Sequence, residues 1–372
     1  MTKANRTIAC FIGTRPECVK MAPVIRALKA CADLNVVTIG TGQHKELVRQ
    51  TLAIFDLSTD VDLDVMTPNQ TLATLTSRLF ERIDPVLETH RPDRVLAQGD
   101  TTTVMAASIA AFYRRIPFGH VEAGLRTGDL QNPFPEELNR VIAGKVADLH
   151  FAPTEGSRDN LLREHIPADR IHVTGNTVID ALLDVTSRPG APSAYPLIAG
   201  RRLVLITAHR RENFGAPLIR IFEAFHVLHD RFPDVEFVYP VHPNPNVREP
   251  ARALLAGLDR FHLIDPVDYL EMAGLIKAAY IVVTDSGGVQ EEAPALAKPV
   301  LVLREETERP EAIAAGVARL IGTDTEAIVD EVTRVLTDPE TYRAMARGSS
   351  PYGDGHAAAR IARLCRGFLA LA

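Results

Sequence analysis

Acidic and basic residues are concentrated in the stretch GHVEAGLRTGDLQNPFPEELNR. Glu122 follows a short apolar run that is typical of a buried strand, and Glu136 opens a predicted helix in which Arg140 lies one turn later. Carboxylates held at the ends of strands and helices can act as general acids or bases. Asp129 and Glu137 of the same stretch are predicted to be loop and surface residues. A solvated loop without function is the alternative interpretation.

A third carboxylate, Asp100, follows the predicted strand 95–97. If this strand and the one before Glu122 are neighbours, Asp100, Glu122 and Glu136 can converge at one edge of a sheet. Repulsion among converging carboxylates would raise the pKa of at least one of them toward neutral pH, which suits a general acid. A helix N-cap is the structural alternative for Asp100.

The sequence TDSGGVQEE follows a β-branched run and opens a helix. Small residues at Ser286, Gly287 and Gly288 would leave backbone N–H groups open at a helix N-terminus, where a diphosphate can bind. Glu292 lies one turn further on and could accept hydrogen bonds from ribose hydroxyls. An ordinary capped turn is the alternative.

Basic residues occupy comparable positions at predicted strand ends. Arg15 and Lys20 flank the first strand–helix turn, and Arg309 follows the strand after the SGG turn. His209, directly after the first strand of the second half, could donate to a diphosphate or transfer a proton near neutral pH. His242 ends the next strand. Solvated cations and a structurally satisfied histidine are the alternatives.

Strands and helices alternate along the chain, which predicts parallel sheets covered by helices on both faces. Strands are predicted at 7–12, 36–39, 95–97, 118–121, 149–152 and 171–173, and then at 203–206, 236–239, 262–264, 281–283 and 300–303. The Pro- and Gly-rich segment 187–200 is the predicted linker between them. We therefore expect an α/β protein with two Rossmann-like domains, whose strand carboxyl ends could share a cleft.

Composition excludes several classes of protein. The 372 residues allow two domains, and a net charge of −6 gives no general attraction to nucleic acid or to an anionic membrane. No apolar segment approaches the roughly 18 residues of a membrane span, so a cytoplasmic protein is expected. The cysteines are expected to be reduced packing residues, because they lack ligand or CxxC spacing; they are Cys10, Cys18, Cys31 and Cys365.

Cofactor motifs are missing from the sequence. The turns after the first strands lack GxGxxG, and the Gly144-Lys145 pair lacks the rest of a Walker A motif, which disfavours a tightly held dinucleotide and phosphoryl transfer from ATP. His44 and His120 add to the polar set, but no histidine spacing matches a metal site. No cofactor and no metal are expected.

Taken in order, the motifs resemble those of the non-hydrolysing UDP-N-acetylglucosamine 2-epimerases. The resemblance covers nearly the whole chain through GTRPECVKMAPVI, TGQH, GDTTT, GHVEAGLRTGDL, PFPEELNR, TGNTVIDAL, AHRRENFG, YPVHPNPNVREP, DSGGVQEEAP, KPVLVLREETERPEA and PYGDG. It implies a GT-B architecture, with two Rossmann-like domains facing a central cleft, and a homodimer. The domains would be 1–186 and 201–350, with the linker 187–200 between them and a C-terminal helix in 351–372 packing back on the first domain.

The resemblance also implies the reaction, which is interconversion of UDP-GlcNAc and UDP-ManNAc. Anti elimination of UDP would give 2-acetamidoglucal, and UDP would then add back after the proton returns to the opposite face of C2. The residues that match the family's catalytic positions are Asp100, Glu122, Glu136, Arg140 and His209. Those that match substrate contacts are Arg15, Lys20, Ser286, Gly287, Gly288, Glu292 and Arg309. Which carboxylate is the base and which the acid stays open.

Some members of this family bind a second UDP-GlcNAc as an activator. Gln43, Glu136, Arg210 and His242 match that site, whereas Glu46 and Asn69 depart from the pattern, which predicts weakened activation. Val267 and Met272 depart from it near the uracil. The alternatives are a hydrolysing epimerase of the same fold, a GT-B glycosyltransferase, and a non-catalytic nucleotide-sugar sensor.

Overall fold

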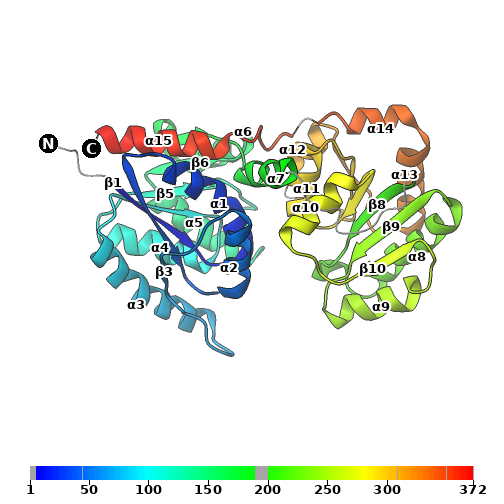
Figure 1. Ribbon diagram of the computed structural model, residues 1–372, viewed down its shortest axis with the longest axis horizontal. Coiled ribbons are helices and arrows are strands. Elements are labelled where there is room, and N and C mark those ends of the chain that lie inside the picture. Colours follow the sequence, from blue (N-terminus) through cyan, green and yellow to red (C-terminus); the bar gives the residue numbers. More distant parts are fainter. Residues whose placement is uncertain (1–5, 44, 189–199, 308, 349, 372) are drawn as a thin grey trace. The chain divides into compact units, whose positions relative to one another are not determined.

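The computed structural model describes residues 6–43, 45–188, 200–307, 309–348 and 350–371 (Figure 1). The chain forms two compact units, which comprise residues 1–181 with 352–372 and residues 182–351. The first unit is therefore discontinuous in sequence. Most of the predicted linker, 189–199, lies outside the described residues, as does His44.

The first unit contains a sheet of seven parallel strands in the order β3-β2-β1-β4-β5-β6-β7. The strands are β1 (Arg6–Ile12), β2 (Leu34–Gly40), β3 (Val61–Asp62), β4 (Arg94–Gln98), β5 (Phe118–Val121), β6 (Leu149–Ala152) and β7 (Ile171–Val173). The helices are α1 (Arg15–Lys29), α2 (Lys45–Ile54), α3 (Leu72–His90), α4 (Thr102–Tyr113), α5 (Glu136–Val146), α6 (Glu155–Arg163), α7 (Thr177–Ser187), which crosses the unit boundary, and α15 (Ala357–Leu371).

Side chains of β1 alternate between two hydrophobic clusters. Ile8 and Ile12 pack in a cluster with residues of α1, α2 and α15, whereas Ala9 and Phe11 pack in another with residues of α3 and α4. Since successive residues of a strand point to opposite faces, helices cover both faces of this sheet. Figure 1 shows α15 beside the sheet of the first unit.

The second unit contains six parallel strands in the order β10-β9-β8-β11-β12-β13. The strands are β8 (Arg202–Thr207), β9 (Val235–Pro240), β10 (Phe261–Ile264), β11 (Ile281–Thr284), β12 (Val300–Val302) and β13 (Ala318–Leu320). The helices are α8 (Ala216–Arg231), α9 (Pro245–Leu255), α10 (Tyr269–Ala278), α11 (Gly287–Ala295), α12 (Pro310–Ala314), α13 (Thr325–Thr337) and α14 (Pro339–Met345).

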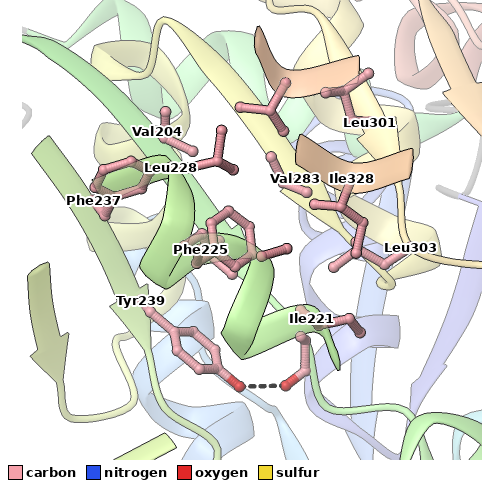
Figure 2. Packing of buried hydrophobic residues seen from close by; sticks show 14 of the residues in the cluster. Val204, Ile221, Phe225, Leu228, Phe237, Tyr239, Val283, Leu301, Leu303 and Ile328 are labelled. Atoms are coloured by element: carbon pink, nitrogen blue, oxygen red, sulfur yellow. Dashed lines mark hydrogen bonds between the residues drawn. The ribbon is translucent and has the colours of Figure 1, made fainter. Parts of the chain in front are cut away.

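The core of the second unit is rich in aromatic side chains, which Figure 2 shows between α8 and the strands. The rings of Phe237 and Phe261 stack with centroids 5.4 Å apart. The buried Tyr239 hydroxyl donates a hydrogen bond of 2.5 Å to the carbonyl oxygen of Ala208 (Figure 2), so this core also fixes the loop after β8.

The two sheets confirm the predicted α/β class with two Rossmann-like domains. Every strand predicted from the sequence is present, with its ends shifted by at most a few residues. In each sheet the order reverses between two central strands, β1 and β4 in one and β8 and β11 in the other. Ligands of open α/β sheets bind outside the carboxyl ends of the strands at such reversals.

Candidate active site

A buried carboxylate, Glu17, joins the two loops at the strand-order reversal of the first unit. Its Oε2 accepts hydrogen bonds from the backbone N–H groups of Gly13 (2.9 Å) and Thr14 (2.5 Å), which follow β1. Its Oε1 accepts a hydrogen bond of 2.6 Å from the Thr101 hydroxyl, which follows β4. Burial raises the pKa of Glu17 to about 7, although these hydrogen bonds lower it.

Asp100 lies beside Thr101 at the end of β4 and is held by α5. Arg140 Nη2 lies 2.7 Å from Asp100 Oδ2, and the Asn139 side chain donates to the Asp100 carbonyl oxygen at 2.9 Å. The helix N-cap residue of α4 is Thr101 and not Asp100. The Asp100 side chain is therefore paired with a cation, and capping does not account for it.

Glu122 lies at the end of β5, next to β4 in the sheet. Lys20 of α1 donates to Glu122 Oε2 at 2.5 Å. The backbone of Glu122 has a φ of 62°, in the left-handed region that residues with a Cβ seldom adopt. Such strain in a non-glycine residue is typical of functional sites. The strands that precede Asp100 and Glu122 are neighbours in the sheet, as the prediction required. Each of the two carboxylates is paired with a cationic side chain.

Glu136 is the first residue of α5 and is partly exposed. The prediction for its neighbour Glu137 was wrong, because Glu137 is buried and accepts hydrogen bonds from the backbone N–H groups of Thr127 and Gly128. Arg140 lies 3.4 Å from Glu137, three residues away on α5. Arg140 thus links Glu137 to Asp100, whereas Asp129 is an exposed loop residue, as predicted.

Gln43 joins the same end of the sheet from the loop after β2. Its Oε1 accepts a hydrogen bond of 2.9 Å from Thr103 Oγ1. A Cβ atom at Gly13 would lie 2.5 Å from that hydroxyl oxygen and 2.6 Å from Gln43 Oε1, so only glycine fits at position 13. Arg15, in the first turn of α1, is partly exposed. His120 is buried, with Nε2 2.7 Å from the Gly99 carbonyl oxygen, and burial lowers its pKa to about 3.

In the second unit, Asp285 organises the loop after β8. Its buried Oδ2 accepts hydrogen bonds from the backbone N–H groups of His209 and Arg210, each at 2.8 Å, and from the Asn213 side chain at 3.0 Å. The His209 ring stacks on His242, with centroids 5.5 Å apart and planes 8° apart. Burial lowers the pKa of His209; Asp285 opposes this shift, whereas His242 and Arg210 add to it.

The SGG turn lies at the end of β11, where Ser286 precedes the first residue of α11. Arg309 reaches this turn from the loop after β12, and its Nε donates to Glu291 Oε1 at 3.0 Å. A Cβ atom at Gly287 would lie 2.8 Å from the Arg309 guanidinium carbon, so the absence of a side chain lets this cation approach the helix N-terminus. Gly288 and the buried Glu292 follow in α11.

The predicted site residues thus form two groups, each at the carboxyl end of one sheet. The first unit carries Arg15, Lys20, Gln43, Asp100, Glu122, Glu136 and Arg140, and the second carries His209, Arg210, His242, Ser286, Gly287, Gly288, Glu292 and Arg309. Sequence reasoning missed three buried carboxylates, Glu17, Glu137 and Asp285. Asp285 directly precedes the glycine-rich SGG turn, which was a usable signal. The hydrogen-bond donors that mark Glu17, Glu137 and Asp285 as site residues include groups elsewhere in the chain, namely Thr101, Thr127 and His209.

The described residues contain no group of three or more His, Cys, Asp and Glu side chains arranged to hold a metal ion. The four cysteines are free thiols, in agreement with the prediction. Within the described part of the chain, no helix combines the length and the apolarity that crossing a bilayer requires.

Two Rossmann-like units in tandem, each with polar loops at the carboxyl ends of a parallel sheet, define an α/β protein of the GT-B class. A family model described as UDP-N-acetylglucosamine 2-epimerase matches residues 26–366. The chain belongs to the UDP-N-acetylglucosamine 2-epimerase family, which confirms the resemblance found in the motifs.

Relatives and solved structures match this chain over nearly its full length. A probable UDP-N-acetylglucosamine 2-epimerase of Ralstonia nicotianae is 51% identical over 374 residues, which cover 98% of this chain and 100% of the relative. The UDP-N-acetylglucosamine 2-epimerase of Escherichia coli K12 is 50% identical over 95% of this chain and 96% of its own. A crystal structure of UDP-GlcNAc 2-epimerase from Neisseria meningitidis bound to UDP-GlcNAc is 45% identical, with a TM-score of 0.90, covering 97% of this chain and 100% of the other.

Proposed function

We propose that the chain is a non-hydrolysing epimerase that interconverts UDP-GlcNAc and UDP-ManNAc. The observation that carries this proposal is the pair of ion-paired carboxylates on adjacent strands, Asp100 with Arg140 and Glu122 with Lys20, in a chain of this family. UDP-GlcNAc as the ligand is supported by the solved Neisseria meningitidis relative, which is bound to that compound.

The reaction runs by anti elimination. A base removes the proton from C2, the C2 electrons form the C1–C2 double bond, and the C1–O bond breaks with its electrons leaving on UDP. The C2 proton is not adjacent to a carbonyl, so departure of the neighbouring diphosphate is what makes its removal feasible without oxidation. UDP then adds back to C1 of 2-acetamidoglucal while C2 takes a proton on the opposite face. Two proton-transfer groups and a stabilised diphosphate meet these demands.

The residues divide by these demands. Asp100, Glu122 and Glu136 supply the base and the acid, and Arg140 holds Asp100. Arg15, Lys20, Arg309 and the N–H groups of the turn at Ser286, Gly287 and Gly288 stabilise the diphosphate, with Glu292 on the ribose. His209 is proposed to donate a hydrogen bond to the diphosphate or to transfer a proton. Helix dipoles and cations of this kind stabilise a leaving diphosphate without reorganisation during the reaction.

Incubation with UDP-GlcNAc in deuterium oxide tests the proposal. Deuterium should appear at C2 of both UDP-sugars. The concentration of free UDP should stay below the combined concentration of the two UDP-sugars. Release of stoichiometric free N-acetylmannosamine would instead identify a hydrolysing epimerase. Binding of UDP-GlcNAc without any label at C2 would identify a nucleotide-sugar sensor, and either outcome would overturn the proposal.

Activation by a second UDP-GlcNAc is proposed to be weak or absent. Gln43, Arg210 and His242 are the residues that would contact it, but Glu46 is an exposed acid on α2, where an acid would repel a diphosphate. Asn69 is an exposed residue with a φ of 56°. The reverse reaction should therefore start without a lag. A pronounced lag that trace UDP-GlcNAc removes would contradict this proposal.

A homodimer is proposed as the working form. Support comes from α4, which is apolar around its whole circumference and leaves Phe112 62% and Tyr113 76% exposed. A helix that is hydrophobic all round is normally covered on all sides. A shallow hollow of about 650 Å³ lies beside these two rings and is lined by Ile116, Pro117 and Val146 among others. The surface that carries these two rings and the hollow would be self-complementary: about a two-fold axis, the rings of each copy would enter the hollow of the other.

A further inference from the structure

One carboxylate oxygen in the second unit is buried without a hydrogen bond. Asp285 has no exposed surface, and its Oδ1 has no hydrogen-bond partner among the described residues. A buried carboxylate oxygen without a hydrogen bond is unfavourable and rare in folded proteins, which makes the surroundings of this oxygen significant.

The ring that faces this oxygen is that of His209. His209 Nδ1 lies 3.6 Å from Asp285 Oδ1, slightly beyond hydrogen-bond distance. The backbone of the same histidine is already tied to the other oxygen of Asp285, since His209 N donates to Oδ2 at 2.8 Å. One carboxylate therefore binds the main chain of His209 through Oδ2 and faces its ring through Oδ1.

The remaining oxygen contacts fix the orientation of the carboxylate. Oδ2 accepts hydrogen bonds from Arg210 N and from Asn213 Nδ2, which leaves Oδ1 as the oxygen that points at the ring. One face of the His209 ring stacks on His242. The imidazole is thus confined in plane and in direction, and its Nε2 is the ring nitrogen farther from Asp285.

We propose that Asp285 is a positioning residue that keeps the proton of neutral His209 on Nδ1, so that Nε2 is the nitrogen that exchanges a proton or a hydrogen bond with the ligand. This inference rests on the proposed function for its catalytic consequence, whereas the tautomer is a property of the free protein. A carboxylate beside Nδ1 also stabilises the imidazolium when Nε2 takes up a proton.

The tautomer can be measured directly by long-range ¹H–¹⁵N correlation spectroscopy on the ¹⁵N-histidine-labelled protein. The His209 signals are assigned by their loss in His209→Gln. We expect the neutral ring to show a protonated Nδ1 and an unprotonated Nε2. A neutral ring protonated at Nε2 would overturn the proposal whether or not the protein is an epimerase.

The variant Asp285→Asn tests the consequence for turnover. The Asn oxygen can keep the contacts of Oδ2, while its NH₂ group replaces Oδ1 and favours the opposite tautomer. In a Ser-His-Asp triad, the same exchange lowers kcat by about 10⁴ with the geometry intact. We expect kcat to fall by at least about 10²-fold and KM for UDP-GlcNAc to change less than about threefold, together with the inverted tautomer.

Tyr239→Phe is the matched control. It removes the 2.5 Å hydrogen bond to the carbonyl oxygen of Ala208, the residue before His209, and keeps the aromatic ring at position 239. Its kcat should stay within about twofold of the unaltered chain. Equal losses of kcat in Tyr239→Phe and Asp285→Asn would reduce Asp285 to a loop anchor and overturn the proposal, as would full turnover in Asp285→Asn. Absence of turnover in the unaltered chain would defeat the proposed function and leave the tautomer test in force.

Discussion

Glu122 combines a strained backbone with an ion pair, and the two features serve one purpose at the residue scale. A left-handed φ costs a residue with a side chain roughly 1 kcal/mol, and the chain retains it where a glycine would be free of that cost. This residue directly follows β5, and Lys20 donates a hydrogen bond to its carboxylate at 2.5 Å.

Removing the charge of either carboxylate should separate chemistry from binding. In Asp100→Asn and Glu122→Gln, kcat for UDP-GlcNAc epimerisation should fall by about 10²–10⁴-fold, because acid–base groups contribute on that scale, while KM changes little. Steady-state kinetics and calorimetric titration with UDP measure the two effects. Asp129→Asn, in the exposed part of the same segment, is the control. Loss of UDP binding equal to the loss of turnover would point to a merely structural role.

Glu17 makes the stability of the first unit depend on pH. Its carboxyl titrates at about 7 in the folded chain and at 4.5 in the reference state, so the folded chain holds more protons between these values. The stabilising contribution of Glu17 is therefore fully present below the lower value and is lost as pH rises through the upper one.

Glu17→Gln should flatten that pH dependence. The difference in unfolding free energy between about pH 5 and pH 7.5 should shrink by on the order of 1–3 kcal/mol relative to the unaltered chain. Thermal or urea unfolding at a series of pH values measures it, with exposed Glu46→Gln as the control. If the unfolding free energies of Glu17→Gln and of the unaltered chain changed in parallel with pH, the pKa of the Glu17 carboxyl would not be raised by burial.

The sequence could predict some of these residues and not others, for a physical reason. Glu122 directly follows an apolar run and Asp100 follows one after Gln98 and Gly99, so local pattern alone places both at strand ends. Glu17 and Asp285 look like ordinary helix-start or turn residues, because Thr101 and His209, which make them significant, lie 84 and 76 residues away. Burial of Glu137 likewise depends on a loop that folds back over α5.

At the element scale, α15 is joined to the first unit by an apolar stripe. Ile361, Cys365 and Leu369 are spaced four residues apart and belong to the same buried cluster as Met21 and Ile25 of α1. Backbone N–H groups at the start of α15 also donate to Asp180 of α7, at 3.2 Å from Ala357 and 2.8 Å from Ala358. Helix α15 is therefore part of this core, and the Asp180 carboxylate caps its N-terminus.

Truncating this stripe should destabilise the first unit. Ile361→Ala removes a fully buried side chain and should cost about 2–5 kcal/mol of unfolding free energy. Arg363→Ala changes an exposed position two residues away and should stay within about 0.5 kcal/mol. Chemical denaturation compares the two. Equal stabilities for both variants would mean that α15 contributes little to the core.

Strand prediction succeeded where the residues are mainly apolar and failed where a charged residue interrupts them. The clearest predicted strands are runs of β-branched and aliphatic residues, such as LVLI in β8 and IVVT in β11, which suffice to mark a buried parallel strand. The edge strands β3 and β13 were not predicted, because their sequences VD and ARL each contain a charged residue and form no apolar run; they are formed by pairing with β2 and β12.

At the scale of the whole molecule, the proposed dimer assigns the apolar face of α4 to a second copy. In the variant with both Phe112→Glu and Tyr113→Glu, two charges would be buried at that contact, so the protein should elute as a monomer. Light scattering coupled to size-exclusion chromatography measures the mass. Ile219→Glu, which alters an exposed aliphatic residue of α8, should leave the mass unchanged. A dimer that survives both Glu substitutions would exclude this face.

The two-unit organisation was predictable in outline, because a Pro- and Gly-rich segment separates two series of alternating strands and helices. That the first unit closes with a helix from the far end of the chain was not visible in the residues, since an amphipathic helix can cover either sheet. The family resemblance supplied that expectation.

The discontinuity of the first unit also sets an order of events during synthesis. Residues 182–351 leave the ribosome before α15 does, so the surface of α1 that Ile361 and Leu369 cover stays bare while the whole second unit is translated. Nascent chains with such uncovered apolar surface are prone to aggregate or to recruit chaperones. Helix α15 is thus the helix that covers this exposed surface of the first unit, and chains that stall or end before α15 should be the form of this protein most in need of chaperone protection.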